Sequence, residues 1–287
     1  MSKIIISTES GSDFPYKITV PHNVQIIPMH ISFGRKTFCD GCFNQEEIYK
    51  YYDRHKQLPK TSAASPGDYT VHFKSIFDRF PDCSIVHISY SAKLSVSYQN
   101  AVLASNDFDS NKIRVVDSLN ASSGLGVLVM FAVKIIEKYQ DAFSFDECVS
   151  LIKQARHRVC CSFIPKSLEY MKAGGRISGA AQFGAAVLNL KPSVVLKNGS
   201  LEAGKKYRGN INRIAFCYMK DFTENNRLEK DFIVIGYSHG VSKNMLFSLK
   251  RYAHKLGFTK SWCFQMGSVV SSHAGPESIG YAGISKL

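Results

Sequence analysis

The sequence predicts an α/β protein of two units, in which a parallel sheet covered by helices is followed by a second α/β unit. The first observation behind this prediction is the alternation of strand and helix patterns through the first half of the chain, which is typical of a parallel sheet. The second is a change near residue 160, where short elements and a hairpin signal interrupt the alternation. We therefore predict an N-terminal domain over residues 1–160 and a C-terminal domain over residues 161–287, with a soft boundary.

The strands of the N-terminal unit are predicted from short apolar runs bounded by polar or turn residues. Such runs suit strands that are covered by helices on both faces. The predicted strands cover residues 3–8, 24–32 (followed by a turn near Gly34), 84–89 and 113–117.

The helices of this unit are predicted from apolar residues at helical spacing behind N-capping residues. Ser65-Pro66-Gly67-Asp68 is the clearest start, with serine as N-cap, proline at the first helical position and an acid at the third. Asn44 with Glu47, and Ser144 with Glu147, have the spacing of capping boxes. The predicted helices cover residues 44–57, 66–80, 94–105, 122–139 and 144–159.

The C-terminal unit is predicted to combine short elements, a hairpin and a closing α/β segment. Asn198-Gly199 is a strong turn signal, so residues 194–196 are expected to pair with those after the turn. Gly174-Gly175 is expected to stop a short helix, whereas Gly124 and Gly126 are expected to allow close helix packing. The remaining predicted elements are strand 160–164, helix 167–173, a small-residue helix 179–188, strand 231–238, helix 243–255 and strand 261–265.

The basic excess of the chain lies entirely in its second half. The formal net charge is +13, but residues 1–150 hold 15 basic and 16 acidic side chains, whereas residues 151–287 hold 21 and 7. This charge is the only argument for nucleic-acid binding, because few aromatic residues and no nucleic-acid-binding signature accompany it. The uneven distribution favours a basic docking face, able to attract an acidic protein surface or, through peripheral contact, anionic lipid.

Composition excludes several classes of protein. A hydrophobic content of 45% with 12% aromatic residues excludes intrinsic disorder. No targeting segment is recognisable, and the longest apolar run, residues 127–133, is too short to span a bilayer. The eight cysteines are scattered, so free thiols in a reducing cytoplasm are expected rather than a disulfide framework.

Cys39-Asp40-Gly41-Cys42 is a CxxC motif. A zinc site usually needs a second cysteine pair, which the sequence lacks, and the nine histidines form no HExxH or related pattern, so no metal is expected. A thioredoxin-like redox site would lie between a strand and the start of a helix. Asp-Gly between two short extended runs favours a tight turn, and the redox interpretation stays open beside it.

Two hydroxyl-rich segments are candidates for anion binding. Thr61-Ser62 precedes a helix start, while Ser91, Ser95 and Ser97 follow the strand at 84–89 and open the next helix. If both segments are loops at the carboxyl ends of parallel strands, their hydroxyl and N–H groups favour an anion there. The alternative is that these residues are ordinary helix caps.

His273 lies in a segment rich in turn residues, 273–278, after the last predicted strand. That position makes a role in a binding site possible, while the alternative is a purely structural histidine. Arg176, after the paired glycines, and Arg208 belong to the basic second half.

A series of sequence blocks is similar, in order, to the motifs of one family. Ser7-Thr8-Glu9-Ser10-Gly11-Ser12-Asp13 is similar to an opening T-D-S-x-x-D, with Glu9 in place of aspartate. On these blocks the chain resembles the DegV family, the fatty-acid-binding subunits of bacterial fatty acid kinase. The other blocks are Ile27-Pro28-Met29 with Asp40, residues 59–65 (P-K-T-S-A-A-S), residues 91–99 (S-A-K-L-S-V-S-Y-Q), Val116-Asp117-Ser118, Gly174-Gly175-Arg176-Ile177-Ser178, Leu190-Lys191-Pro192, Tyr207-Arg208 and His273-Ala274-Gly275-Pro276.

The resemblance implies a two-domain protein that holds a long-chain fatty acid in a buried tunnel between its domains, with no other cofactor. It implies a subunit that is not itself an enzyme. Such a subunit presents the acyl carboxylate to a separate ATP-dependent kinase and carries the acyl phosphate to an acyltransferase for phospholipid synthesis.

The resemblance also implies roles for particular residues. Thr61 and Ser95 would hold the carboxylate through their hydroxyls, with Ser62 and Ala92 beside them. Ser91 and the backbone N–H groups near it would assist. Arg176 and His273 would form the polar network around the headgroup, and Arg208 would contact the kinase. Beyond the resemblance, we expect hydroxyls to orient the carboxylate and Arg176 and His273 to stabilise its phosphorylated form.

The chain departs from the family pattern at several of these positions. The departures are Ala63 and Ala64 for Gln-Pro, Ala92 for serine, Val96 for glycine and Glu277 for the glycine after Pro276. A serine-dependent lipid hydrolase, with Ser91 or Ser95 as nucleophile and His273 as base, remains an alternative function. The sequence contains no GxSxG nucleophile elbow.

Overall fold

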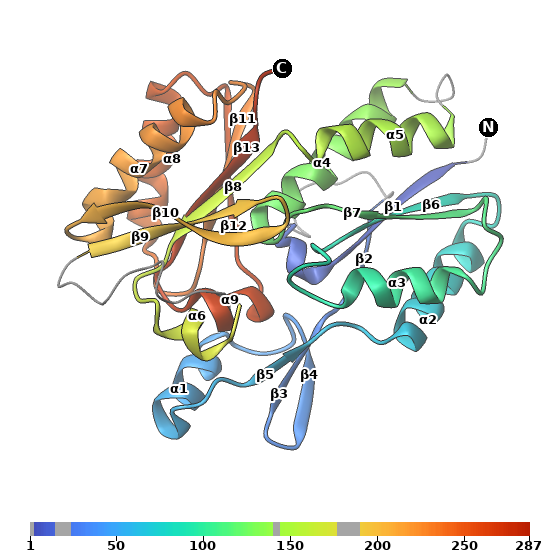
Figure 1. Cartoon of the computed structure of the whole chain (residues 1–287), viewed down its shortest axis with the longest axis horizontal. Helices are drawn as coiled ribbons and strands as arrows, with labels where there is room; N and C mark the ends of the chain where they lie inside the picture. Colours follow the sequence, from blue (N-terminus) through green and yellow to red (C-terminus); the bar gives the residue numbers. More distant parts are fainter. Residues whose placement is uncertain (1–2, 15–23, 140–143, 177–189) are drawn as a thin grey trace.

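The computed structural model describes residues 3–14, 24–139, 144–176 and 190–287 of the chain. Two sheets lie side by side, and a small third sheet lies below them in Figure 1. The first sheet is parallel throughout and has the strand order β2-β1-β6-β7. Its strands are β1 (Ile4–Glu9), β2 (Val24–Ile27), β6 (Ser84–Ser89) and β7 (Ile113–Asp117).

Helices cover both faces of the parallel sheet, which explains why β1 and β6 are buried along their whole length. Ile5 packs on one side with Tyr69 and Phe73 of α2, while Ile4 and Ile6 pack on the other side with residues of α4 and α5. These helices are α2 (Pro66–Arg79), α3 (Ser97–Ser105), α4 (Ser122–Tyr139) and α5 (Phe145–Ala155).

The second sheet is mixed and has the order β10-β9-β8-β13-β11-β12. β13 runs antiparallel to both of its neighbours, and only β11 and β12 pair in parallel. α7 (Ile211–Asn225) and α8 (Lys243–Lys255) pack on one face through a common apolar cluster. The strands are β8 (Val159–Ile164), β9 (Leu190–Lys197), β10 (Ser200–Arg208), β11 (Phe232–Tyr237), β12 (Lys260–Gln265) and β13 (Ile279–Ile284).

Helix α4 packs against both large sheets. One apolar cluster joins its residues Leu125 and Leu128 to Val86 of the parallel sheet and Val234 of the mixed sheet. Gly124 and Gly126 allow this approach, as the sequence predicted, because added Cβ atoms would lie 2.7 Å from Cys161 Cβ and from the Ser12 carbonyl oxygen, respectively. Within the described residues, no helix combines the length and apolar character needed to cross a membrane.

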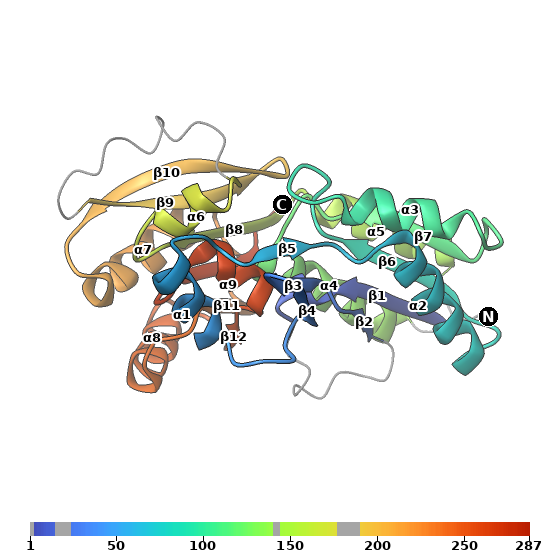
Figure 2. The ribbon, with the colours of Figure 1, turned by 90° about the horizontal axis from the view of Figure 1, so that it is seen from below.

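The small antiparallel sheet has the order β4-β3-β5 and lies beside α1 and α9 (Figures 1 and 2). Its residue Ile31 and Met29, just before β3, share a cluster with Tyr49 of α1 and Val269 of α9. The remaining elements are η1 (Ser10–Ser12), β3 (His30–Phe33), β4 (Lys36–Cys39), α1 (Glu46–His55), β5 (Lys60–Ser62), α6 (Glu169–Ala173) and α9 (Ser268–Ala274).

Most predicted elements are confirmed, including the N-cap at Ser65, the capping box at Ser144 and the hairpin at Asn198-Gly199. The prediction of a capping box at Asn44 and Glu47 is wrong. Asn44 Oδ1 accepts from the Glu46 N–H at 3.0 Å, whereas Glu47 pairs with Lys50.

Other differences concern whole elements. The extended run 24–32 is divided into β2 and β3, which belong to different sheets, and the helix predicted over 94–105 begins at Ser97. α7, α9 and β13 were not predicted, although β13 lies at the centre of the mixed sheet. The small-residue helix predicted over 179–188 lies outside the described residues.

Candidate functional site

A cavity of about 560 Å³ lies where the two large sheets, the small sheet and α9 meet. This volume falls within the usual range for small-molecule sites. Most of its walls are apolar and come from both halves of the chain. The apolar lining residues include Met29, Leu94, Val96, Phe163, Met171, Leu196, Leu201, Met266, Val269 and Val270.

The polar part of the cavity wall contains a contact between two distant segments. Thr61 Oγ1 lies 2.9 Å from His273 Nε2, and both residues line the cavity. Both residues were predicted to lie in loops. That prediction is wrong, because Thr61 belongs to strand β5 and His273 to helix α9. The contact therefore joins two regular elements, and this fixes its geometry more firmly than two loops would.

His273 is neutral, and its two ring nitrogens differ in their surroundings. Burial, with a smaller effect of Arg176, lowers its pKa to about 3. Its Nδ1 atom is buried against Gly174 and has no hydrogen-bond partner among the residues that the structure describes. Buried polar atoms are almost always hydrogen-bonded, so this nitrogen is an exception in the wall of the cavity.

The paired glycines before Arg176 shape this end of the cavity. A Cβ atom on Gly174 would lie 2.2 Å from His273 Nδ1, so only glycine leaves room for the imidazole ring. Gly175 adopts a positive φ of 66°. Arg176 lines the cavity from an exposed position, and its Nη1 donates to the Gly174 carbonyl at 2.7 Å. The glycines thus place a guanidinium beside a neutral imidazole.

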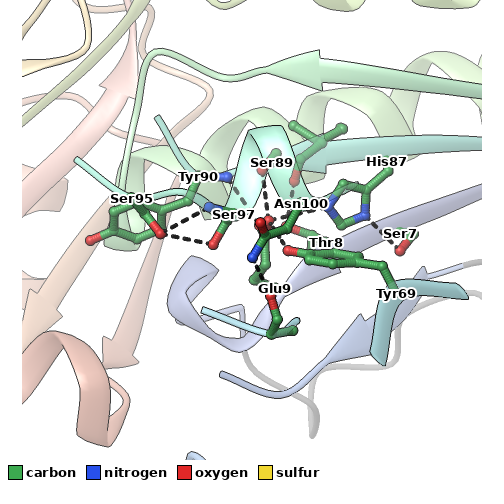
Figure 3. Close-up of polar contacts among 12 residues, drawn as sticks. Ser7, Thr8, Glu9, Tyr69, His87, Ser89, Tyr90, Ser95, Ser97 and Asn100 are labelled. Atoms are coloured by element: carbon green, nitrogen blue, oxygen red, sulfur yellow. Dashed lines mark hydrogen bonds and ion pairs between the residues drawn. The ribbon is translucent and has the colours of Figure 1, made fainter. Parts of the chain in front are cut away.

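Ser95 lines the cavity from the segment before α3, and its hydroxyl lies 2.9 Å from that of Ser97 (Figure 3). The neighbouring Val96 has φ −77° and is 61% exposed, so its backbone conformation does not require the family's glycine. Ser62 and Ala92 also line the cavity.

Ser91 has a different position from the one expected. It is fully buried, is absent from the cavity lining, and donates through Oγ to the Gly199 carbonyl at 2.7 Å. The N–H groups of Lys93, Leu94 and Ser95 bond to Ser91 itself, and that of Ala92 bonds to Asp117. Ser91 therefore anchors the β9–β10 turn, and these N–H groups are already used within the protein.

Glu277 points away from the headgroup region. Its carboxylate forms an ion pair with Lys166 at 2.5 Å, and its φ is +55°, a conformation that suits the glycine of the family pattern. Arg208, at the end of β10, is exposed and lies opposite Leu190 in the hairpin. It is separate from the cavity lining.

A buried polar network behind the cavity was missed by the sequence analysis (Figure 3). The Glu9 carboxylate accepts from Tyr69 Oη at 2.8 Å, Ser89 Oγ at 2.7 Å and the Tyr90 N–H at 3.0 Å, and it contacts His87 Nε2 at 3.1 Å. Burial opposes ionisation of Glu9, but His87 and the two hydroxyls hold its pKa below the ordinary value. Tyr90, which lines the cavity, is thus held by a buried carboxylate.

Two more buried carboxylates hold the start of α9. Asp13 accepts from the Gly267 N–H at 2.7 Å, and Asp40 accepts from the Ser268 N–H at 2.6 Å. Burial raises the pKa of both groups, that of Asp13 to about 8. These acids position the helix that carries His273. Their only signal in the sequence was their occurrence in the family-like blocks.

Comparison with known proteins gives a consistent result. The DegV family model, described as "Uncharacterised protein, DegV family", matches residues 3–286. A DegV domain-containing protein of Caldanaerobacter subterraneus is 29% identical over 98% of each chain.

Two solved structures are similar over nearly their whole length. A DegV family protein of Thermus thermophilus, described for its fatty acid binding, has a TM-score of 0.86 at 26% identity and covers 99% of this chain and 100% of its own. A stearic acid-binding protein of Eubacterium ventriosum has a TM-score of 0.82 at 26% identity, over 100% of this chain and 99% of its own. The match across the whole chain, on the predicted α/β fold, shows that this protein belongs to the DegV family.

Proposed function

We propose that this protein binds a long-chain fatty acid in the cavity and presents its carboxylate to a separate ATP-dependent kinase. The observation that carries the proposal is a mainly apolar cavity whose polar wall contains Ser95 and the contact between Thr61 and His273. Support also comes from the Thermus and Eubacterium relatives, which are described as fatty-acid-binding and stearic acid-binding proteins.

Apolar contact supplies most of the binding free energy in this proposal. Each buried methylene contributes about 0.8 kcal/mol, so a chain of about 15 methylenes contributes roughly 12 kcal/mol before entropy losses. The headgroup site therefore needs to orient the carboxylate more than to bind it tightly. Neutral groups such as Thr61, Ser95 and His273 suit that task, because they leave the carboxylate nucleophilic toward ATP.

The phosphorylated headgroup carries more negative charge than the carboxylate. Arg176 lies beside His273 at the exposed end of the cavity. Its guanidinium would stabilise the acyl phosphate there while this product is still bound to the protein. Arg208 on the exposed hairpin would contact the kinase, and an acyltransferase would receive the acyl phosphate.

The contacts favour this binding function over a serine hydrolase. The hydroxyl of Ser91 donates to Gly199, that of Ser95 contacts Ser97, and His273 contacts Thr61. A nucleophile and its base are expected within hydrogen-bonding reach of each other, and neither serine makes that contact with His273.

Denaturing extraction of the purified protein, followed by mass spectrometry, tests the proposal. We expect about one long-chain fatty acid per chain. Extraction of an acyl-free protein that also fails to take up added fatty acid would contradict it. A reactive-serine probe serves as the control, since labelling of Ser95 would support the hydrolase instead.

A further inference from the structure

Cys39 and Cys42 form a pair of thiols outside the cavity. They begin and end a tight turn after β4, in which the Cys42 N–H donates to the Cys39 carbonyl at 3.1 Å. Gly41 within the turn has φ +87°. The turn is the one that the sequence predicted, and the proposed function does not use its cysteines.

The geometry of this turn suits a disulfide. The ends of a β-turn have Cα atoms less than 7 Å apart, and disulfides span Cα distances of about 4.4–6.8 Å. Burial raises the pKa of the Cys39 thiol, and the neighbouring Cys42 thiol raises it further. All eight cysteines are free in this structure, and Cys42 is exposed whereas Cys39 is half-buried. One thiol of the pair is therefore open to an oxidant and the other lies next to it.

Asp40, between the two cysteines, connects the turn to the cavity. Its carboxylate accepts from the N–H groups of Ser268 and Val269 and from Ser10 Oγ. Its own N–H donates to the Met29 carbonyl at 2.8 Å. The turn thus holds the start of α9, the helix whose Val269, Val270 and His273 line the cavity.

We infer that Cys39 and Cys42 are a redox-sensitive dithiol, oxidised by hydroperoxides to a disulfide that tightens the hold of Asp40 on α9. The Cys42 thiolate attacks the peroxide and becomes a sulfenic acid, and the other oxygen of the peroxide leaves as hydroxide or alkoxide. The proton that Cys42 released on ionising converts this leaving group to water or alcohol. The Cys39 sulfur then displaces hydroxide from Cys42, and the Cys39 proton converts that hydroxide to water. In total, two thiols are oxidised and one peroxide is reduced.

The expected consequence is slower local opening at the start of α9. A cross-link removes conformations in which the turn opens and releases Asp40, and for a loop this short the chain-entropy effect is on the order of tenfold. Slower exchange of a bound fatty acid would follow, and this last step rests on the proposed function. The thiol chemistry and the opening of α9 do not depend on it.

Maleimide trapping after treatment with hydrogen peroxide tests the chemistry. We expect the wild-type protein to lose two labelling sites and 2 Da in one peptide that contains both cysteines. Cys42→Ser should abolish this loss, whereas the matched control Cys217→Ser, which removes an exposed cysteine on α7, should retain it. Full labelling of Cys39 and Cys42 after peroxide, or a disulfide between other cysteines, would overturn the inference.

Amide hydrogen exchange tests the coupling. The Ser268 and Val269 amides should exchange roughly tenfold more slowly in the oxidised wild-type protein than in the reduced protein. Peroxide should leave their exchange unchanged in Cys42→Ser. Equal exchange in the oxidised and reduced wild-type protein would overturn the link between the disulfide and α9, whether or not the protein binds fatty acid.

Discussion

At the residue scale, the proposed function gives the contact between Thr61 and His273 a role in holding the carboxylate. Replacing Thr61 by valine keeps the shape of the side chain and removes its hydroxyl. Because one hydrogen bond is worth about 1 kcal/mol, we expect roughly fivefold weaker fatty acid binding, measured by displacement of a fluorescent fatty acid. Thr37→Val is the control, since its hydroxyl contacts Ser32 on the exposed surface of the small sheet. Equal affinities for all three proteins would contradict the role given to Thr61.

Asp13 gives a pH-dependent prediction at the same scale. Its pKa is raised by burial from 3.8 to about 8, so the folded state binds its proton more tightly than the unfolded chain does. Its contribution to stability is complete below pH 4 and is lost as the pH rises through about 8.

Urea unfolding between pH 5 and pH 9 measures this effect. Relative to Asp13→Asn, the wild-type protein should lose roughly a few kcal/mol of its free energy of unfolding between pH 5 and pH 9. Asp53→Asn, at an exposed position on α1, should keep the wild-type slope. An Asp13→Asn variant with the wild-type slope would show that Asp13 does not titrate in this range.

At the scale of elements, the junction between α6 and α9 makes a separate prediction. Alanine at Gly174 would bring a Cβ atom to 2.2 Å from His273 Nδ1, so the imidazole must move. We expect Gly174→Ala to weaken fatty acid binding about tenfold or more, because it disturbs the Thr61 contact as well as the cavity wall. Gly67→Ala in α2 is the control, since the nearest atom to its Cβ would be 3.8 Å away. Unchanged binding by Gly174→Ala would show that the position of His273 is unimportant.

Elements with local signals could be predicted from the sequence, and those that depend on distant residues could not. Ser65 and Asp68 form a capping box from neighbouring residues, and this signal located α2. α9 has only seven residues and is held by Asp13 and Asp40, which lie 254 and 228 positions away in the sequence from their N–H partners. No local pattern contains that information.

Two further elements were missed for different reasons. α7 has its apolar residues at helical spacing behind the N-cap Asn210, so its signal was present in the sequence. β13 contains two glycines, which are unusual in a strand. Gly280 is needed there because a Cβ atom would lie 2.7 Å from Phe163 Cβ. This requirement for glycine arises only from the pairing of β13 with β8.

The distinction between local signals and contacts with distant residues also applies to the cavity. The family-like blocks contained Thr61, Ser95, Arg176 and His273, and the structure brings all four to its lining. Their roles toward a ligand remain predictions. The sequence could not separate Ser91, which bonds to the β9–β10 turn, from Ser95, because that distinction depends on a contact 108 residues away.

At the scale of the whole molecule, the basic second half predicts where the proposed kinase would dock. Arg208→Ala should reduce kinase-dependent phosphorylation of the bound fatty acid several-fold and leave the fatty acid content unchanged, because Arg208 is separate from the cavity lining. Steady-state kinetics with the cognate kinase, at low and high salt, measure the effect. Arg251→Ala removes an exposed arginine of α8 and should behave as wild type. Equal rates for both variants would exclude Arg208 from the docking face.

The position of α4 also determines how the chain unfolds. The helix lies before residue 160, yet it forms one apolar cluster with strands of both large sheets. Removal of either half would expose part of that cluster to water, so neither half has a complete core of its own. We therefore expect a single cooperative transition in calorimetry, with equal calorimetric and van't Hoff enthalpies. The predicted division near residue 160 would then mark a change of architecture, while the parts on both sides of it unfold together on heating.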